Sequence, residues 1–488
     1  MVIESLKYKI LQQFGFAPTQ EQGQALDTFV SFLTDRDPQA VMILRGSAGT
    51  GKTSLSGAIV RTLLQIRQKV MLLAPTGRAA KVFSLGSGAP AYTIHRRIYR
   101  EKAFAGVDGQ FSLNDNLYTD TLFMVDEASM IANMGLGGTT FGSGCLLDDL
   151  VKFVYQGHND RLLLIGDKAQ LPPVGEEESP ALSASVMEGY GLKVYECDLN
   201  EVLRQSQSSG ILYNATLIRQ MITHDAVTGL PLIRFKGFAD IVMMPGAELV
   251  ESLGDSYHHV GMDETMVITR SNKRANIYNN GIRNMVLDRE EELSSGDMLM
   301  IVKNNYFWTE KEKKESGEGS AGAVPAFLAN GDRAKVLRVS NYIELYGFRF
   351  ATLLLQLPDY DDYEMQVTGM LDTLQSEALA LTHEQQEELF RQVEEDYQHF
   401  VPLKADRMKS IRQDAYFNAL QIKYAYAVTC HKAQGGQWAH VYVDQGYMTD
   451  DMLTPDYIHW LYTAFTRATD KLFLVNWPKE QTCEPTDL

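Results

Sequence analysis

The sequence has few cysteines, and none of them are paired at a metal-binding spacing. Cys145, Cys197, Cys430 and Cys483 are scattered along 488 residues, without a C-x-x-C pair. This distribution argues against a disulfide framework or a structural zinc site. Isolated thiols are typical of a reducing compartment, so we expect a cytoplasmic protein.

Long hydrophobic runs are also missing. The sequence has no stretch of about 18 uncharged apolar residues, so we expect no transmembrane helix and no membrane partner. The opening segment MVIESLKYKILQQ has the pattern of an amphipathic helix with mixed charge, without the apolar core and cleavage site of a signal peptide. A hydrophobic content of 45% and a charged content of 22% are ordinary for a globular protein. At this length the chain is expected to divide into about three or four compact units.

Positive charge is in short supply. The formal net charge is −17, and taken alone this disfavours a nucleic-acid partner, because contacts to phosphates need basic groups. Much of the acid lies in local runs that solvated surfaces explain best, at 176–178, 288–292, 359–364 and 377–396. A basic channel can coexist with such an exterior, so the net charge weakens a nucleic-acid interpretation without excluding it.

The sequence does contain a complete phosphate-binding loop. An apolar run at 41–44 predicts a buried strand, and SLSGAIVRTLLQ at 54–65 predicts the following helix. Between them the chain matches G-x-x-x-x-G-K-[ST], whose glycines let backbone N–H groups surround a di- or triphosphate at the positive end of a helix. The loop consists of Gly46, Ser47, Ala48, Gly49, Thr50, Gly51, Lys52 and Thr53.

Two residues of this loop have specific expected roles. Lys52 would reach the β- and γ-phosphates of ATP, and the Thr53 hydroxyl would ligate Mg²⁺. The alternative is an incidental glycine-rich turn. The order strand, loop, helix favours nucleotide binding.

An acidic pair follows another apolar strand at 121–125. Polar residues at the carboxyl end of a parallel strand face the crevice in which ligands bind. Asp126 can hold Mg²⁺, and Glu127 can orient and deprotonate an attacking water. The alternative is an exposed helix start with two acids, which the helix dipole favours.

A third polar loop, GDKAQLPPV at 166–174, follows the apolar run at 162–165. The carboxamide of Gln170 can contact a γ-phosphate and a neighbouring group at once, which suits a sensor of the nucleotide state. The same segment could equally be a loop stiffened by its two prolines, and the residues alone leave both interpretations open.

Strand and helix signals alternate from residue 39 to about 205, as expected of a parallel sheet covered by helices. A second α/β pattern begins with an expected strand at 266–269 and a helix at 273–286, and it resumes near residue 424. Between the halves lies a β-rich insertion, whose tract at 310–323 is expected to be a disordered hairpin tip and whose end carries charged helices. A separate interruption at 103–114 has Asp108-Gly109 between two short runs, which predicts a two-residue hairpin turn.

Taken in order, these segments resemble the superfamily 1 helicases, most closely the 5′-to-3′ RecD/Dda-like branch (superfamily 1B). The amino-terminal half supplies PTQEQ (18–22), GSAGTGKT (46–53), APTGRAAK (74–81), TIHRRI (93–98), DEAS (126–129), GDKAQLPPVG (166–175) and LNEVLRQ (199–205). The carboxyl-terminal half supplies TRSNKRAN (269–276), LANGD (328–332), AVTCHKAQGGQW (427–438) and YTAFTRA (462–468). These ordered motifs span nearly the whole chain.

The resemblance implies an α/β fold with two RecA-like parallel-sheet P-loop domains, a β-hairpin pin insertion and an SH3-like β-barrel insertion with a helical extension. The implied boundaries are 1–95 with 121–205 for domain 1A, 96–120 for the pin, 206–292 with 418–488 for domain 2A, and 293–417 for the barrel domain. Whether the helical extension docks on the pin is left open.

The resemblance also implies further nucleotide contacts. Gln22 corresponds to an adenine-reading glutamine, with a helix-capping residue as the alternative. Arg204 and Arg467 correspond to arginine fingers that act on the γ-phosphoryl group in the transition state, where surface ion pairs would be the alternative. Gln437 lies where the family has an acid that contacts ribose, and this substitution puts the ribose contact in doubt.

Six residues correspond to the family's contacts with the nucleic-acid backbone, namely Pro75, Thr76, Arg78, His95, Thr429 and His431. Such contacts position a strand without reading its sequence. His431 could instead be a core histidine bonded to the backbone. Phe104 and Phe111 lie in the pin, where an aromatic ring could stack on a base at the fork or could stabilise the hairpin itself.

The expected activity is therefore that of a monomeric, ATP- and Mg²⁺-dependent helicase that moves 5′-to-3′ on single-stranded DNA and unwinds 5′-tailed duplexes, in DNA replication or repair. Two alternatives stay open at this point. One is an RNA helicase or remodeller on the same scaffold, and the other is a P-loop ATPase that responds to nucleic acid without unwinding it.

Overall fold

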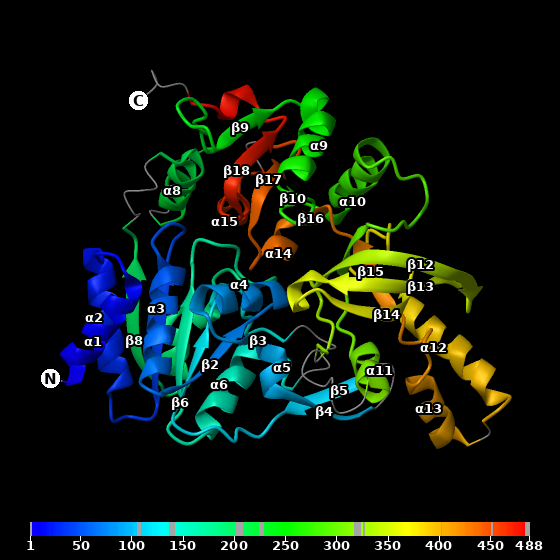
Figure 1. Ribbon diagram of the computed structural model, residues 1–488, viewed down its shortest axis with the longest axis horizontal. Coiled ribbons are helices and arrows are strands. Elements are labelled where there is room, and N and C mark those ends of the chain that lie inside the picture. Colours follow the sequence, from blue (N-terminus) through cyan, green and yellow to red (C-terminus); the bar gives the residue numbers. More distant parts are fainter. Residues whose placement is uncertain are drawn as a thin grey trace. The chain divides into compact units, whose positions relative to one another are not determined.

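The structure is a computed structural model that describes residues 2–104, 109–135, 142–201, 208–223, 229–316, 324–325, 327–401, 403–449 and 452–483. The chain forms two compact units (Figure 1). The first comprises Met1–Met244 with Ala433–Leu488, and the second comprises Pro245–Lys432. Each unit is described by itself below.

A parallel sheet forms the centre of the first unit. Its described strands, in spatial order, are β3 (Ala91–Thr93), β2 (Lys69–Ala74), β6 (Thr121–Val125), β7 (Arg161–Gly166), β1 (Ala40–Gly46) and β8 (Lys193–Leu199). All their pairings are parallel. The carboxyl ends of β1, β6 and β7 therefore lie at one edge of the sheet, and each is followed by one of the polar loops noted in the sequence.

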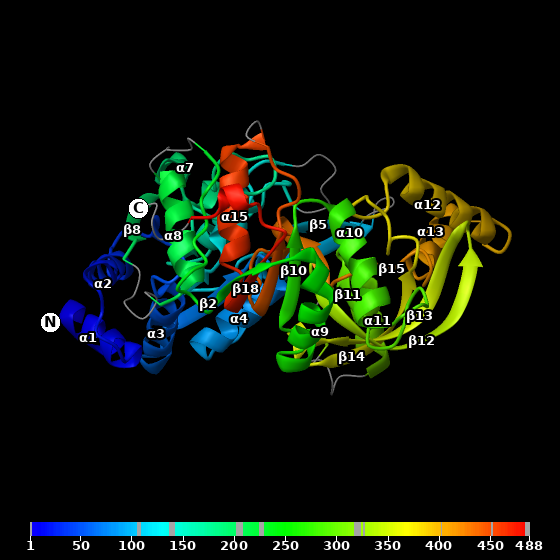
Figure 2. The ribbon, with the colours of Figure 1, turned by 90° about the horizontal axis from the view of Figure 1, so that it is seen from above.

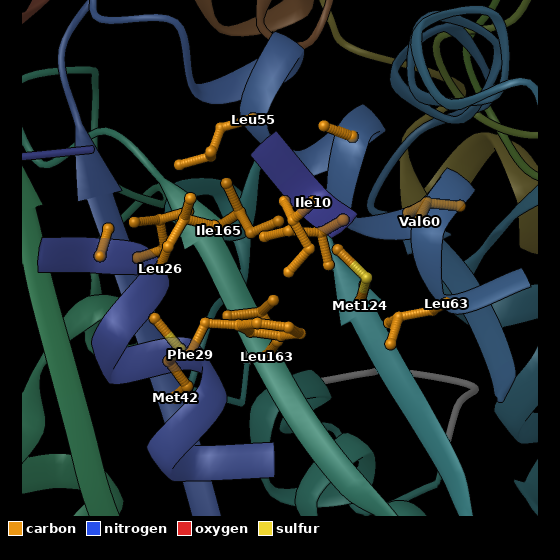
Figure 3. Packing of buried hydrophobic residues seen from close by; sticks show 14 of the residues in the cluster. Ile10, Leu26, Phe29, Met42, Leu55, Val60, Leu63, Met124, Leu163 and Ile165 are labelled. Carbon is orange, nitrogen blue, oxygen red and sulfur yellow. The ribbon is translucent and has the colours of Figure 1, made fainter. Parts of the chain in front are cut away.

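Both faces of this sheet are covered, which explains why its strands are continuous apolar runs rather than alternating ones. On one face, Met42 and Leu163 pack with residues of α1 (Val2–Phe14), α2 (Gln20–Leu33) and α3 (Lys52–Gln65), as Figure 3 shows. On the other face, a second cluster is built around α5 (Ile94–Ile98) and α6 (Leu146–Gln156). The expected strands are all present, and β3 is an additional short strand.

The first unit also contains three parallel strands from later in the chain. They are β9 (Ile241–Met244), β18 (Ala468–Val475) and β17 (Trp438–Asp444), with β18 between the other two. Helix α8 (Gly210–Thr223) packs against α15 (Pro455–Phe465), and Figures 1 and 2 show the two helices side by side. Most of α15 is buried, because its apolar residues recur all around the helix.

The second unit is built on a closed barrel. Its strands are β11 (Met298–Ile301), β12 (Arg333–Leu345), β13 (Phe348–Leu357), β14 (Tyr363–Met370) and β15 (Leu420–Tyr424). Helices α12 (His383–Gln398) and α13 (Lys404–Arg412) cover part of the barrel through a cluster that includes Phe348, Phe350 and Met370. The same unit contains α9 (Leu249–His259), α10 (Asn272–Gly281), α14 (Cys430–Ala433) and the parallel pair β10 (Thr265–Thr269) and β16 (Ala427–Thr429). The predicted α/β fold with a barrel insertion and helical extension is confirmed.

Two local predictions are wrong. The disordered tip predicted at 310–323 is wrong for residues 310–316, because α11 (Phe307–Ser316) runs through them, and residues 317–323 lie outside the described residues. The helix is anchored by Trp308, which is buried and donates its indole N–H to the Asn418 carbonyl at 2.9 Å. The pin strands β4 (Tyr99–Phe104) and β5 (Gly109–Leu113) pair Phe104 with Gly109, so Gly109 belongs to a strand and not to a two-residue turn.

Across the described ranges, none of the helices has the length and apolar character needed to cross a bilayer. The four cysteines carry free thiols. No group of three or more His, Cys, Asp or Glu side chains in the described part of the chain is arranged to hold a metal ion.

Candidate nucleotide site and strand-contact residues

The phosphate loop connects β1 to α3 in a conformation that requires glycine. Gly49 and Gly51 have φ angles of 77° and 81°, in the left-handed region that other residues rarely adopt. A Cβ on Gly46 would lie 2.8 Å from the Lys52 side chain and 2.9 Å from that of Thr50. Helix α3 begins at Lys52, two residues earlier than predicted, so Lys52 and Thr53 occupy its first turn.

Lys52 folds back over the loop. Its ammonium group donates hydrogen bonds to the backbone carbonyl of Gly46 and, at 2.9 Å, to that of Ser47. In a nucleotide complex a P-loop lysine donates to the β- and γ-phosphates, so phosphate oxygens would replace these carbonyl oxygens as its acceptors. The ammonium lies beside the first two residues of the loop, and its phosphate contacts stay a prediction.

The acidic pair lies directly after β6. Burial and, to a smaller extent, the adjacent charge of Glu127 raise the pKa of Asp126 to about 7, although the hydrogen bond from the Glu127 amide and the charge of Lys52 oppose the rise. A carboxylate destabilised in this way gains from a nearby cation. Glu127 has a φ of 51°, an unusual backbone conformation for a residue other than glycine, and its side chain is 21% exposed.

Arg467 follows α15 and is 2% exposed. Its guanidinium donates to the carbonyls of Thr463 and Gly436 at 3.0 and 3.1 Å and to the Thr466 hydroxyl at 3.1 Å. One guanidinium nitrogen also lies 4.0 Å from a carboxylate oxygen of Glu127. The fold thus brings the predicted finger and the predicted general base together although they are far apart in sequence. The alternative of a surface ion pair does not fit a buried arginine.

Gln170 is placed beside the same loops. Its side chain is 5% exposed, and its Oε1 is buried without a hydrogen-bond partner in the described part of the chain. The cost of such an oxygen is about 1–3 kcal/mol, which a hydrogen-bond donor brought by a ligand or a bound water would offset. The backbone of this loop is tied to α15, because the Leu171 amide donates to the Thr463 hydroxyl at 2.8 Å.

Two residues without a role from sequence reasoning also reach the phosphate loop. The Tyr462 hydroxyl donates to Asp167 Oδ2 at 2.6 Å and accepts the Ala48 amide at 3.0 Å. Arg219, on α8, donates to the Ser47 hydroxyl. Tyr462 stood inside the YTAFTRA motif, whereas the pattern around Arg219 gave no signal at all.

Gln22 caps a helix and also contacts the phosphate loop. Its Oε1 accepts the Thr19 amide at 3.0 Å, which completes a capping box at the start of α2. Its Nε2 donates to the Thr50 carbonyl of the phosphate loop at 2.9 Å. One amide hydrogen and one lone pair are left for other partners. The side chain therefore caps a helix at the edge of the nucleotide loop, and adenine reading stays a prediction.

Three predicted strand-contact residues lie at the start of α4 (Gly77–Ser87). Pro75 precedes Thr76, whose hydroxyl caps the helix by accepting the Ala79 amide at 3.2 Å. Arg78 donates to the Gln437 carbonyl at 3.0 Å and lies over the Trp438 ring, 5.9 Å from its centroid. The side chain of Gln437 is exposed, so nothing in its burial opposes a ligand contact.

The other three predicted contacts lie in two units. His95 in α5 is partly buried, and desolvation lowers its pKa to about 4, so the ring is neutral at pH 7 and can offer a hydrogen bond but no charge. Thr429 ends β16 and His431 follows in α14, both in the second unit. His431 is exposed, and this excludes the alternative of a core histidine.

Of the three remaining candidates, Arg204, Phe104 and Phe111, only Phe111 has a side chain among the described residues. Arg204 lies outside them, as does the Phe104 side chain. Phe111 is partly buried and packs against the core cluster on the α5 and α6 face of the sheet. This contact favours the structural interpretation for Phe111 and leaves Phe104 as the candidate for the fork.

Phe111→Ala is expected to lower the free energy of unfolding by about 1–3 kcal/mol, because a partly buried ring loses its contacts with the core. Thermal unfolding measures this change, with Leu117→Ala, at an 89% exposed position, as the control. A melting temperature unchanged in Phe111→Ala would return that ring to the list of fork candidates.

Phe104→Ala is expected to lower unwinding more than ATPase activity.

Two protein-family models match the chain. The AAA domain model matches residues 17–229, and the UvrD-like helicase C-terminal domain model matches residues 424–475. The first range contains the phosphate loop, the acidic pair and Gln170, and the second contains Gln437 and Arg467. The two models and the relatives below support a superfamily 1B helicase.

Individual superfamily 1B proteins are similar over parts of the chain. The ATP-dependent RecD2 DNA helicase of Deinococcus radiodurans is 30% identical over 157 residues, which cover 32% of this chain and 18% of the relative. The ATP-dependent DNA helicase dda of Enterobacteria phage T4 is 25% identical over 267 residues, covering 53% and 55%. The chain thus spans less than two thirds of either relative. A crystal structure of Pif1 helicase from Bacteroides, in complex with ADP-AlF3 and ssDNA, aligns at 13% identity and a TM-score of 0.46, covering 96% of this chain and 95% of that one.

Proposed function

We propose that the protein is an ATP-dependent DNA helicase that translocates 5′-to-3′ on single-stranded DNA and unwinds duplexes with a 5′ tail. The observation that carries this proposal is the position of Arg467, which is buried just after α15 and lies 4.0 Å from Glu127 in the unit that contains a complete phosphate loop. A finger arginine next to a general base is the arrangement that hydrolysis of a terminal phosphate requires.

The residues of the site divide the work of hydrolysis. Loop amides from Gly46 to Thr53 and the Lys52 ammonium bind the phosphates. Glu127 orients and deprotonates the attacking water, and Arg467 together with Arg204 neutralises charge that develops on the transferred phosphoryl group. Gln170 offers its free Oε1 to a donor that arrives with the nucleotide.

The donor set fits a magnesium ion. A carboxylate at Asp126 and a hydroxyl at Thr53 are the hard oxygen ligands that Mg²⁺ prefers, and both follow strands or loops at one edge of the sheet. Burial and the neighbouring Glu127 raise the pKa of Asp126, so a cation bound there would stabilise its carboxylate. When bound there, Mg²⁺ would supply positive charge that neutralises the phosphates.

Helix α15 supports a coupling of nucleotide state to movement. It carries Tyr462, which contacts the phosphate loop, and Thr463, which contacts the Gln170 loop, and Arg467 follows at its carboxyl end. Binding or hydrolysis of ATP would therefore act on α15 and on Arg467, which connects α15 to β18. Motion of such catalytic elements is how closure of a site is linked to mechanical work.

DNA is the proposed track because the RecD2 and dda relatives are named DNA helicases. Thr76, Arg78 and His95 in the first unit, and Thr429 and His431 in the second, are the proposed backbone contacts. The 5′-to-3′ direction rests on the family resemblance alone. An RNA track would use the same kind of contact, so stimulation of ATP hydrolysis by single-stranded DNA against RNA distinguishes the two.

A strand-displacement assay tests the proposal. ATP-dependent release of a labelled strand is expected from a 5′-tailed duplex and not from a 3′-tailed one, and Lys52→Ala is expected to abolish it because the phosphates lose their main cation. Robust ATP hydrolysis without displacement from either substrate would favour a nucleic-acid-stimulated ATPase over a helicase.

A further inference from the structure

Arg219 is an arginine at the rim of the phosphate loop that no motif of the sequence accounts for. It lies on α8, and one of its guanidinium nitrogens donates to the Ser47 hydroxyl and lies 3.5 Å from the Asn200 side-chain oxygen. The chain reaches this contact across 172 sequence positions. Helix α8 packs against α15, so the position of Arg219 is set by the helix that carries Tyr462.

In the part of the chain that the structure describes, the charge of Arg219 is not matched by a carboxylate. Within the described ranges no acidic side chain lies within 4.0 Å of its guanidinium, although the side chain is partly buried. Arg45, at the start of the same loop, shows the contrast, because Asp198 and Glu196 bind it at 2.7 and 2.8 Å. A partly buried cation is normally paired, so an unmatched one beside an anion-binding loop points to an anionic ligand.

The position along the loop identifies which phosphate Arg219 can reach. Lys52 places its ammonium on the carbonyls of Gly46 and Ser47. Arg219 contacts the side chain of that same Ser47. The two cations therefore lie at the same end of the loop, and a P-loop lysine serves the β- and γ-phosphates, of which ADP lacks the γ-phosphate.

Tyr462 supports the same assignment. Its hydroxyl oxygen accepts the Ala48 amide, one of the N–H groups that a bound phosphate would use. The Tyr462 hydroxyl thus accepts a hydrogen bond from the Ala48 amide, and the Ser47 hydroxyl accepts one from Arg219. Phosphate oxygens of an incoming nucleotide would take over both contacts.

We propose that Arg219 binds the terminal phosphate of ATP and makes the loop prefer ATP over ADP. The inference rests on the proposed ATP-binding function and adds a third cation to Lys52 and Arg467. It also gives α8 a way to respond to hydrolysis, because loss of the terminal phosphate returns Arg219 to Ser47.

Calorimetric titration of the full chain with Mg-ATPγS and with Mg-ADP tests this inference. Arg219→Gln is expected to weaken ATPγS binding about 10- to 100-fold, the range of a charge-assisted hydrogen bond, and ADP binding by less than about threefold. Arg36→Gln is the charge-matched control, because Arg36 is exposed on the surface of the same unit. It is expected to bind both nucleotides like the wild type.

Two further variants separate the explanations. Ser47→Ala removes the present partner of Arg219 but not the proposed phosphate contact, so it is expected to keep the preference for ATPγS.

Three outcomes would overturn the inference without overturning ATP binding. Arg219→Gln could weaken the binding of both nucleotides equally, or it could weaken neither. Ser47→Ala could also lose the preference for ATPγS to the same extent as Arg219→Gln. Lack of nucleotide binding by the wild-type chain, or unchanged binding in Lys52→Ala, would overturn the proposed function itself. Should Arg219→Gln unfold, Arg219→Lys is expected to show a smaller loss confined to ATPγS.

Discussion

Glu127→Gln is expected to lower ATP turnover by about 10²- to 10⁴-fold, the usual contribution of a general base. Glutamine has the shape of glutamate but cannot accept the proton of the attacking water. The carboxylate is also the group that faces Arg467 at 4.0 Å and raises the pKa of Asp126. Its neutralisation should leave Asp126 easier to ionise, and so nucleotide and Mg²⁺ are expected to bind at least as well as in the wild type.

Single-turnover hydrolysis and nucleotide titration together measure this effect. Glu188→Gln, at an exposed position in α7 (Ala184–Gly189), makes the same change of charge and is expected to match the wild type in both assays. Turnover in Glu127→Gln within about threefold of the wild type would remove Glu127 from the general-base role.

Arg467→Lys is expected to reduce turnover by about 10³-fold or more, because an arginine finger is worth 10³- to 10⁵-fold in comparable enzymes. Lysine keeps the charge but cannot hold the carbonyls of Thr463 and Gly436 while it also faces a phosphoryl group. The loss should appear in the rate of hydrolysis and only weakly in the affinity for ADP.

A buried arginine can also act as a structural residue, and a matched variant separates the two roles. Arg161 is buried in the same unit and donates to the backbone carbonyls of Phe32 and Asp35. Arg161→Lys is expected to lower the melting temperature without the large loss of turnover. If Arg467→Lys lowered stability as Arg161→Lys does and turned over ATP normally, Arg467 would be a structural residue and not a finger.

The elements that the sequence predicted correctly are those whose signals are local. The strand at Thr121–Val125 and the phosphate loop follow from runs of neighbouring residues, because a buried parallel strand needs continuous apolar side chains and a phosphate loop needs glycines at fixed spacing. The β-rich character of the insertion and its charged helices were also predictable from the residues, whereas the barrel was implied by the family resemblance.

The failures come from contacts made at long range. Trp308, at the start of the helix that runs into the tract expected to be disordered, donates to the carbonyl of Asn418, 110 positions later. Tyr462 meets Asp167 across 295 positions, and Arg219 meets Ser47 across 172. No local pattern announces such partners. The roles of Arg467, Gln22 and the strand-contact residues stay predictions, because their positions are now known but their ligands are not.

The central claim is that ATP breaks down between Glu127 and Arg467, and that α15 transmits this event. A crystal structure with ADP-aluminium fluoride, Mg²⁺ and a short single strand of DNA tests it most directly. We predict an Arg467 guanidinium nitrogen at hydrogen-bonding distance from the fluoride that stands for the transferred phosphoryl group, about 3 Å away. A guanidinium that still binds only the Thr463 and Gly436 carbonyls, turned away from the aluminium fluoride in the strand-bound complex, would contradict the claim.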